Sequence, residues 1–157
     1  MTDAADPLIS ADVLRGVSRM LYRHDFLSVP EVSLRNNRRA DIMAIGPRGE
    51  LTIIEIKVSR ADLLGDGKWP EYLEFCDRYF WAVPQGFDLT LFERDQLCPD
   101  ITGLIVADRY DAAIIREAPV RPLAAARRKT ETLRLARLAT RRMLSLSAIF
   151  DIDLGDG

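Results

Sequence analysis

The first part of the chain alternates between two hydrophobic patterns, one typical of a helix and one typical of strands. Apolar side chains three and four positions apart occur at Val13, Leu14, Val17, Met20 and Leu21. This spacing places them on one side of a helix, and it predicts a helix over residues 10–24. Ser10 is the N-cap candidate, because a serine hydroxyl accepts hydrogen bonds from the first helical turn.

Three strands are predicted next, because the apolar positions change to β-branched runs separated by polar turns. The stretch "LSVPEVSLRNN" (27–37) is typical of a strand that ends in a polar turn. "RRADIMAIG" (38–46) and "LTIIEIKVS" (51–59) flank the turn "GPRGE". Two strands joined by such a short, glycine-containing turn indicate a β-hairpin.

The rest of the chain predicts a second helical region, a buried strand and several additions. Ser59 begins a short helical turn that glycine ends, and Pro70 suits the first position of the next helix, predicted over 70–78. The run "YFWAVP" (79–84) is apolar enough for a strand buried on both faces. Three further strand candidates and a long helix follow at 87–92, 102–108, 112–117 and 123–148.

This order of elements predicts an α/β (α+β) fold with a mixed central sheet flanked by helices. We expect one domain over residues 1–157, because a chain of this length can bury a single sizeable core. The predicted core spans about 10–84, with additional strands over about 87–117 and a C-terminal basic helix over about 120–149.

Composition narrows the class of protein. The chain is 48% hydrophobic and 29% charged, which is typical of a globular protein rather than a disordered one. No apolar run approaches the roughly 18 residues that a membrane span needs. Residues 1–10 lack the basic and apolar regions of a signal peptide. We therefore expect a cytoplasmic protein with no membrane partner.

Cysteine and histidine are too few for several kinds of site. Cys76 and Cys98 give neither a disulfide framework nor zinc-ligand spacing, so we expect both to be small buried residues. His24 is the only histidine, which argues against a histidine-based nucleophilic triad. We expect His24 at the surface, at the end of a helix.

Charge is distributed unevenly along the chain. Residues 120–149 contain eight basic side chains and one acidic side chain, whereas the whole chain has a net charge of −2. The first 119 residues are therefore acidic. An acidic body with a basic appendage suits a protein that holds both a metal ion and a polyanion.

Two charges occur inside the apolar run 51–59, and their spacing indicates a site. Side chains alternate between the two faces of a strand, so Glu55 and Lys57 share a face with Leu51. A hairpin register in which Ile45 faces Leu51 brings charged residues of both strands together at one edge. The pairs on this face are then Met43 with Ile53, Asp41 with Glu55, and Arg39 with Lys57.

The chemistry of these side chains favours a metal site. Carboxylates on directly opposite residues, with Cβ atoms about 5 Å apart, repel each other unless a cation lies between them. Mg²⁺ prefers such oxygen ligands, and Lys57 beside it could orient water or stabilise charge on a phosphate. Only three of the 22 basic residues are lysine. The alternative is a structural ion pair between one of the acids and Lys57 or Arg39.

These residues resemble the motif of the PD-(D/E)xK nuclease superfamily, which has a restriction-endonuclease-like fold. That motif has an acid at the start of the second strand and (D/E)xK in the third, here Asp41 and Glu55-Ile56-Lys57. Ala40 replaces the proline of the motif. More narrowly, residues 38–84, 103–117 and 123–142 are similar to the MmcB-type DNA-repair endonucleases of bacteria. The superfamily core order is helix, three strands, helix, strand, as predicted above.

The resemblance implies a metal-dependent DNA endonuclease of DNA repair that hydrolyses phosphodiester bonds with metal-activated water. Asp41, Glu55 and the Ile56 carbonyl would then bind Mg²⁺ or Mn²⁺, and Lys57 would position or activate the water. Candidate outer residues of this site are Glu31, Ser59, Lys68, Tyr72 and Asp77. Ser59 as an N-cap, and Tyr72 and Asp77 as packing residues, are the structural alternatives.

DNA is the expected partner, and other DNA-repair proteins and a second copy of the chain are further candidates. Basic residues that could contact phosphate are Arg38, Arg39, Lys68, Arg127, Arg128, Lys129 and Arg134. Trp69 and Trp81 could stack on bases, but both lie beside core-like runs, which favours packing. A non-catalytic DNA-binding or recruitment module is the second hypothesis. An adaptor whose basic helix binds an acidic protein is the third.

Overall fold

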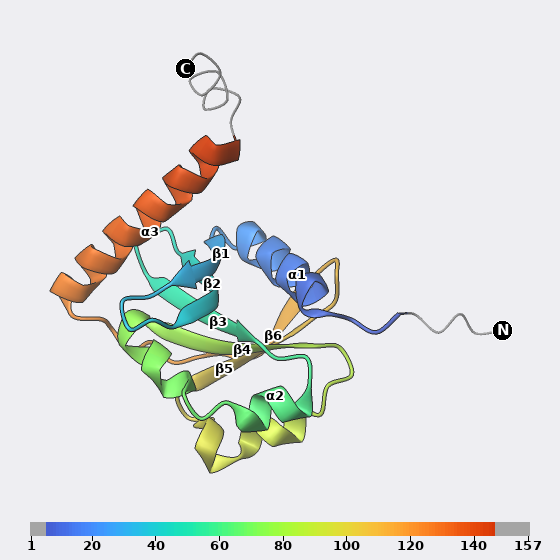
Figure 1. Ribbon diagram of the computed structural model, residues 1–157. Coiled ribbons are helices and arrows are strands. Elements are labelled where there is room, and N and C mark those ends of the chain that lie inside the picture. Colours follow the sequence, from blue (N-terminus) through green and yellow to red (C-terminus); the bar gives the residue numbers. More distant parts are fainter. Residues whose placement is uncertain (1–5, 147–157) are drawn as a thin grey trace. The chain divides into compact units, whose positions relative to one another are not determined.

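The structure is a computed structural model that describes residues 6–146 (Figure 1). The chain divides into two compact units, Met1–Leu123 and Ala124–Gly157. The first contains a sheet with helices, and the described part of the second is one long helix. Residues 147–149, which the sequence assigns to the end of that helix, lie outside the described residues.

The first helix, α1 (Ser10–Arg23), confirms the predicted periodicity, but its N-cap is Ile9 rather than Ser10. The carboxylate of Asp12 accepts a hydrogen bond from the Ile9 N–H at 3.0 Å, which closes the first turn from inside the helix. The serine hydroxyl is therefore not needed as a cap. His24 ends the helix and is exposed, as predicted.

One six-stranded mixed sheet contains the strands of the described chain, and its spatial order is the sequence order. The first two pairings are antiparallel, the next two are parallel and the last is antiparallel. The strands are β1 (Leu27–Ser33), β2 (Arg39–Ile45), β3 (Leu51–Ile56), β4 (Arg78–Pro84), β5 (Thr102–Ala107) and β6 (Ala112–Arg116). The mixed α+β fold and the order helix, three strands, helix, strand are confirmed.

The hairpin register is also confirmed. Ile45 pairs with Leu51 and Met43 pairs with Ile53, which is the pairing that the side-chain alternation requires. The ladder between β2 and β3 then ends at the pair Ile42–Ile54. The next residues toward the sheet edge are Asp41 and Glu55, so the register brings the two acids opposite each other.

The crossover between parallel β3 and β4 carries two short helices on one face of the sheet, while α1 covers the other (Figure 1). They are α2 (Arg60–Gly65) and the 3₁₀-helix η1 (Trp69–Phe75). Parallel neighbours need such a crossover connection. The expected α-helix over 70–78 is instead this 3₁₀-helix, with Pro70 in its first turn.

The prediction of a strand over 87–92 is wrong. This segment forms the 3₁₀-helix η2 (Leu89–Glu93), followed by a second, η3 (Asp95–Leu97). The Asp88 carboxylate accepts hydrogen bonds from the Thr90 N–H at 3.1 Å and the Thr90 hydroxyl at 2.6 Å. This local cap favours a turn, and it outweighs the β propensity of the apolar residues.

The two faces of the sheet have different cores. Against α1 the core is aliphatic, with Val13 and Val17 packed on Ile42 and Ile54. Against η1 it is aromatic: the rings of Trp69 and Trp81 are 5.2 Å apart, and those of Tyr79 and Trp81 are 5.1 Å apart. Both tryptophans are buried, which confirms packing rather than base stacking.

The turn between β5 and β6 is fixed closely against α1. The backbone carbonyls of Asp108 and Asp111 approach Gly16, so a Cβ there would lie 1.9 Å and 2.6 Å from them. Two ion pairs reinforce the contact, Arg23 with Asp111 and Arg109 with Asp12 at 3.6 Å. Gly16 is thus the position at which helix and turn meet without a side chain between them.

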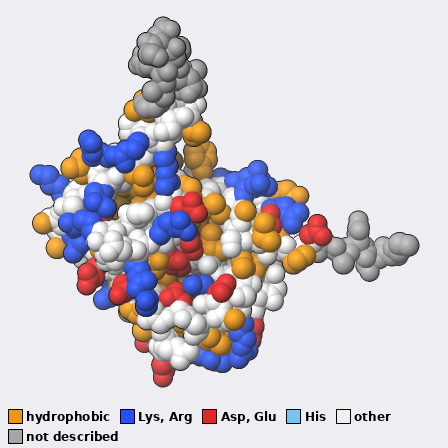
Figure 2. Space-filling model, viewed as in Figure 1, with side chains coloured by type: hydrophobic (Ala, Val, Ile, Leu, Met, Phe, Trp, Pro, Cys, Tyr) orange, Lys and Arg blue, Asp and Glu red, His pale blue; other side chains and the backbone are white. Residues whose placement is uncertain are grey.

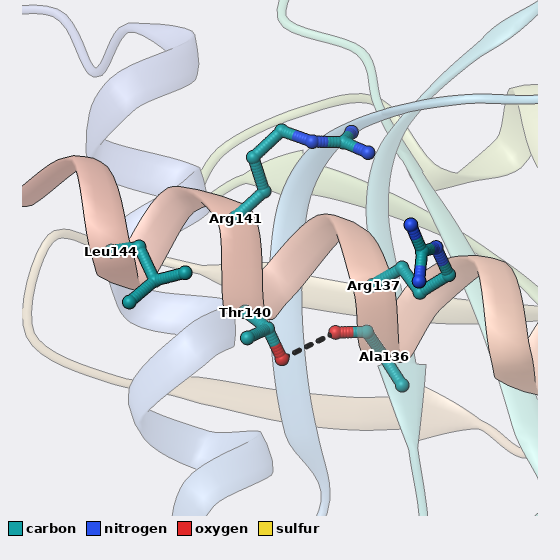
Figure 3. Close-up of a pocket in the computed structure, with 5 residues that line it drawn as sticks. All are labelled: Ala136, Arg137, Thr140, Arg141 and Leu144. Atoms are coloured by element: carbon teal, nitrogen blue, oxygen red, sulfur yellow. Dashed lines mark hydrogen bonds between the residues drawn. The ribbon is translucent and has the colours of Figure 1, made fainter.

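The second unit contributes α3 (Ala125–Leu146), the predicted basic helix. On it, Arg137 and Arg141 extend to one side of a shallow pocket, and the Thr140 hydroxyl donates a hydrogen bond to the Ala136 carbonyl at 2.8 Å (Figure 3). Within residues 6–146, none of the helices combines the length and the apolar character that a membrane crossing needs.

Substitution of Gly16 by alanine should destabilise the fold strongly. Alanine normally stabilises a helix by roughly 1 kcal/mol relative to glycine. Here its methyl group would overlap two backbone carbonyls, so helix or turn must move. We expect Gly16→Ala to lower the free energy of unfolding by about 2 kcal/mol or more, measured by urea denaturation.

Gly65→Ala is the matched control, because an added Cβ at this helical glycine meets no atom within 4 Å. We expect it to leave the stability close to that of the wild type. A Gly16→Ala protein as stable as Gly65→Ala would contradict the close contact between α1 and the turn.

Candidate functional site

Asp41 and Glu55 end the β2–β3 hairpin with side-chain hydrogen bonds in place of ladder bonds. The Glu55 carboxylate accepts the Asp41 N–H at 3.2 Å, and the Asp41 carboxylate accepts the Ile56 N–H at 2.8 Å. Each acid therefore satisfies a backbone donor of the opposite strand. The reciprocal bonds hold the two carboxyl groups together at the sheet edge; we call them the acid pair.

Burial makes this arrangement electrostatically costly. Glu55 is only 5% exposed, and it pairs in register with buried Trp81 of β4. Desolvation, with the neighbouring Asp41 charge as the second cause, raises the pKa of Glu55 from 4.5 to about 9. Near neutral pH the acid pair of the metal-free protein therefore holds a proton that an exposed glutamate would release.

Tyr72 of η1 closes the site over the aromatic core. Its hydroxyl donates a hydrogen bond to the Arg39 carbonyl at 2.9 Å, which attaches η1 to the start of β2. Burial raises the pKa of Tyr72, and the nearby Glu55 and Asp41 charges raise it further. The phenol therefore stays neutral and acts as a hydrogen-bond donor beside the acid pair.

Two buried polar atoms of the same core have no hydrogen-bond partner within the described chain. They are the Tyr79 hydroxyl and the Trp81 indole nitrogen, both on the face of β4 that carries the pair Glu55–Trp81. Burial raises the pKa of Tyr79 well above its usual value, and the charges of Glu55 and Asp66 add to this effect. Unpaired donors beneath carboxylates are typical of functional sites rather than of packed cores.

Lys57 lies just after β3, and its partner is a residue that the sequence did not indicate. Its ammonium nitrogen is 2.8 Å from the Asp66 carboxylate, and the two side chains are 13% and 18% exposed. Asp66 also accepts the Lys68 N–H at 3.1 Å, which orders the loop "GDGK" (65–68). In the sequence, the only feature that marks this loop is the position of Asp66 between Gly65 and Gly67.

The remaining predicted outer residues are dispersed. Glu31 lies abreast of Asp41 on β1, is exposed, and is 4.0 Å from Arg39. The Ser59 hydroxyl caps α2 by accepting the Asp62 N–H at 3.1 Å, as the structural alternative predicted. Lys68 is exposed at the start of η1.

Asp77 has a structural position. Its carboxylate accepts the Leu51 N–H at 2.8 Å and the Leu123 N–H at 2.9 Å. Leu51 is at the opposite end of β3 from Glu55, about 13 Å away along the strand. The structure therefore does not bring Asp77 to the acid pair, and the side chain instead joins two segments of the first unit.

The candidate phosphate contacts fall into three groups. Arg38 forms an ion pair with Glu71 of η1. Arg39 is exposed beside the acid pair and does not contact Lys57. Apart from Lys68, described above, the other basic residues of the set are Arg127, Arg128, Lys129 and Arg134, and they belong to α3 in the second unit. Within the first unit, Arg39 is thus the exposed arginine of this set that adjoins the acid pair.

The donor chemistry of the acid pair fits a hard divalent cation. Two carboxylates meet beside the Ile56 backbone, and oxygen ligands of this kind suit Mg²⁺ or Mn²⁺. Within residues 6–146, no three acidic, histidine or cysteine side chains converge on one point. The fit is therefore to an ion that keeps most of its waters, which is typical of Mg²⁺.

Glu55→Gln should stabilise the metal-free protein, with a benefit that grows with pH. Because folding raises the pKa of Glu55 from 4.5 to about 9, the wild type loses stability as pH rises between these values. Glutamine has no proton to lose. We expect a gain on the order of 3 kcal/mol at pH 7 and little gain at pH 4.5, measured by denaturation in EDTA.

Glu74→Gln, at an exposed glutamate of η1, is the matched control and should show no such pH dependence. Mg²⁺ at pH 8 should raise the unfolding midpoint of the wild type more than that of Glu55→Gln. Equal stability of wild type and Glu55→Gln at every pH would contradict the buried acid pair.

Comparisons with known proteins agree with the motif. A family model described as "DNA repair protein MmcB-like" matches residues 1–149. A solved structure of a protein of unknown function from Silicibacter pomeroyi is 46% identical, with a TM-score of 0.76 and 92% of each chain covered. Among curated proteins, none matches this chain at a significant level.

Proposed function

The chain belongs to the MmcB-like DNA repair protein family, and from this premise we propose that it is a metal-dependent DNA endonuclease. Its role in DNA repair follows from the family. The reaction would be hydrolysis of a phosphodiester bond at the acid pair, with Mg²⁺ or Mn²⁺ as cofactor. The resemblance to the PD-(D/E)xK motif and the geometry of the acid pair both support this reaction.

The observation that carries the proposal is the burial of two carboxyl groups against each other. Glu55 is held beside Asp41 by reciprocal backbone hydrogen bonds although its pKa is raised to about 9. A purely structural pair has no need for two acids, because one acid with a basic partner would close the hairpin at lower cost. A divalent cation would remove the repulsion.

Each side chain of the site would have a separate role in the reaction. Asp41 and Glu55 would hold the cation, which supplies activation of water and charge stabilisation on the phosphate. Lys57, two residues after Glu55 at the end of β3, would donate hydrogen bonds to the attacking water or to the phosphate oxygens. Asp66 holds the ammonium in one position through their ion pair. Arg39, exposed beside the acids, is available to a neighbouring phosphate.

A non-catalytic DNA-binding or recruitment module is the second candidate. The observation in its favour is that Lys57 contacts Asp66 and that, within the described residues, the acid pair has no third carboxylate. Such a module would bind DNA with no need for Glu55. Cleavage assays therefore separate the two candidates directly.

We expect Mg²⁺- or Mn²⁺-dependent cleavage in a panel of single-stranded, duplex, flapped and branched DNA. Asp41→Asn and Glu55→Gln should abolish it, because each removes a cation ligand. Lys57→Ala should lower the rate by about 10²-fold or more, as loss of a group that acts on the water or phosphate does. Product formation on denaturing gels measures all three.

Glu74→Gln, an exposed acid away from the pair, is the control and should cut like the wild type. Loss of metal binding in Glu55→Gln, measured by calorimetry with Mn²⁺, should accompany the loss of cleavage. Cleavage that persists in all three site variants would refute the proposal. Salt-sensitive DNA binding without cleavage of any substrate would favour the second candidate.

Asp66→Asn tests how Lys57 is held. Asparagine keeps the size of the side chain but removes the charge that orients the ammonium. We expect a roughly tenfold lower turnover with unchanged Mn²⁺ affinity, since residues that orient a reacting group have effects of this size. A change in metal affinity equal to that of Glu55→Gln would instead place Asp66 among the metal ligands.

A further inference from the structure

A basic and aromatic hollow lies on the solvent-facing side of α1. It has a volume of about 490 Å³ and is lined by Arg15, Ser18, Arg19, Tyr22, Arg23 and Tyr110. We call it the α1 hollow. In Figure 2, blue basic side chains gather beside hydrophobic ones in the region of α1. The hollow is wide and open to solvent, so it suits a ligand that lies across the surface rather than one enclosed in a cleft.

The α1 hollow and the acid pair lie on opposite sides of the sheet. The buried side of α1 packs on Ile42 and Ile54, whereas Asp41 and Glu55 are their immediate neighbours along each strand. Successive side chains point to opposite faces, so the acids face away from α1. The hollow is therefore a separate surface and not an extension of the acid pair.

Two of the three arginines of the hollow carry positive charge that no acidic side chain of the described residues pairs with. Residues 13–24 contain three arginines and no acid. Arg23 is paired with Asp111, whereas Arg15 and Arg19 have no hydrogen-bond or ion-pair partner within residues 6–146. They are one helical turn apart on the same side of α1, so both guanidinium groups face the hollow. An exposed helix face without acidic residues favours an anionic ligand.

Two tyrosine rings flank these arginines and are unusually exposed. Tyr22 is 73% exposed and Tyr110 is 66% exposed, from α1 and from the β5–β6 turn respectively. Covering a large exposed ring with another flat surface lowers the free energy, because apolar area is removed from water. Nucleobases offer such a surface, and stacking on aromatic side chains is how single strands are bound without sequence preference.

The turn that carries Tyr110 is fixed in place. The Asp108 carboxylate accepts the Tyr110 N–H at 2.7 Å and the Asp111 N–H at 2.9 Å. The contact at Gly16 and the pair Arg23–Asp111 hold this turn on α1. The backbone of Tyr110 is therefore positioned before any ligand arrives, which lowers the entropy lost on binding.

We propose that the α1 hollow binds single-stranded DNA, with Arg15 and Arg19 on phosphates and the rings of Tyr22 and Tyr110 stacked on bases. The proposal goes beyond the nuclease assignment, because binding here needs neither metal nor the acid pair. Arginines alone would also suit an acidic protein. The two exposed rings favour DNA, since they supply stacking surfaces that match neighbouring bases.

Fluorescence anisotropy of the full chain with a labelled 12-nucleotide oligothymidylate, in EDTA at low salt, tests the surface. The double variant Arg15→Ala/Arg19→Ala should weaken binding by about tenfold or more and should lower the salt dependence by about two phosphate contacts. Tyr22→Leu/Tyr110→Leu keeps the charge and should weaken binding by at least about fivefold, through lost stacking. Tyr22→Phe/Tyr110→Phe keeps both rings and should bind like the wild type.

Arg137→Ala/Arg141→Ala is the matched control, because it removes two exposed arginines at the same spacing from α3 (Figure 3). It should weaken binding less than Arg15→Ala/Arg19→Ala does. Circular dichroism should show that all four variants stay folded, since every substituted side chain is exposed. Photo-crosslinking with bromodeoxyuridine DNA should modify peptides that contain Tyr22 or Tyr110.

Three results would overturn the proposal. Equal losses in the α1 and α3 arginine variants would mean that overall charge, not this surface, binds the strand. Full affinity in the tyrosine-to-leucine variant would exclude stacking. Displacement of the strand by polyglutamate at the same concentration of charge as by unlabelled DNA would show a general polyanion surface, as an acidic protein partner requires. Because the assay is run in EDTA, a protein that never cuts DNA can still confirm the α1 hollow.

Discussion

The candidate site depends on the end of the β2–β3 hairpin, where side-chain carboxylates accept the hydrogen bonds that backbone carbonyls accept elsewhere in the ladder. Regular pairing of β2 and β3 stops at Ile42–Ile54, and the next two donors are satisfied by carboxylates. Because each acid bonds the opposite strand, neither can turn to solvent without leaving a backbone N–H unpaired. The bonds that complete the sheet therefore also force the two acids together.

The sheet separates the acid pair on one face from α1 on the other. On one face, the aromatic core of η1 and β4 surrounds Glu55 and excludes water, which strengthens every charge interaction there. On the other, α1 is packed on an aliphatic core and fixed to the β5–β6 turn through Gly16. The sheet thus lies between the acid pair and α1. The outer side of α1 does not pack on the sheet, and it exposes arginine and tyrosine side chains.

Sequence alone located the hairpin site because strand geometry leaves few choices. A short turn fixes the register, and side-chain alternation then brings Asp41 opposite Glu55. Local hydrogen bonding, in contrast, cannot be read from periodicity. The Asp88 cap turned a predicted strand into η2, and the Asp12 carboxylate replaced Ser10 at the start of α1. In each case one short polar side chain decided the outcome.

The sequence did not predict the ion-pair partner of Lys57, for a related reason. The register sets Arg39 opposite it, and the family motif associates it with the acids, yet its ion pair is with Asp66 from a loop between two glycines. A loop has no repeating pattern that fixes which side chain points inward. The α1 hollow shows the same limit, since Tyr110 lines the same hollow as Tyr22 only because the chain folds back against Gly16.

Charge balance explains why this pairing suits a cation site. Were Lys57 bound between Asp41 and Glu55, the ammonium would neutralise the acids and occupy the space of an ion. With Lys57 paired to Asp66, the Lys57 charge offsets only part of the effect of burial and of the neighbouring Asp41 charge, and the pKa of Glu55 stays raised. The four ionised groups would sum to −2, which one divalent cation balances. Asp66 thus keeps the lysine near the acids but out of the position between them that a cation would take.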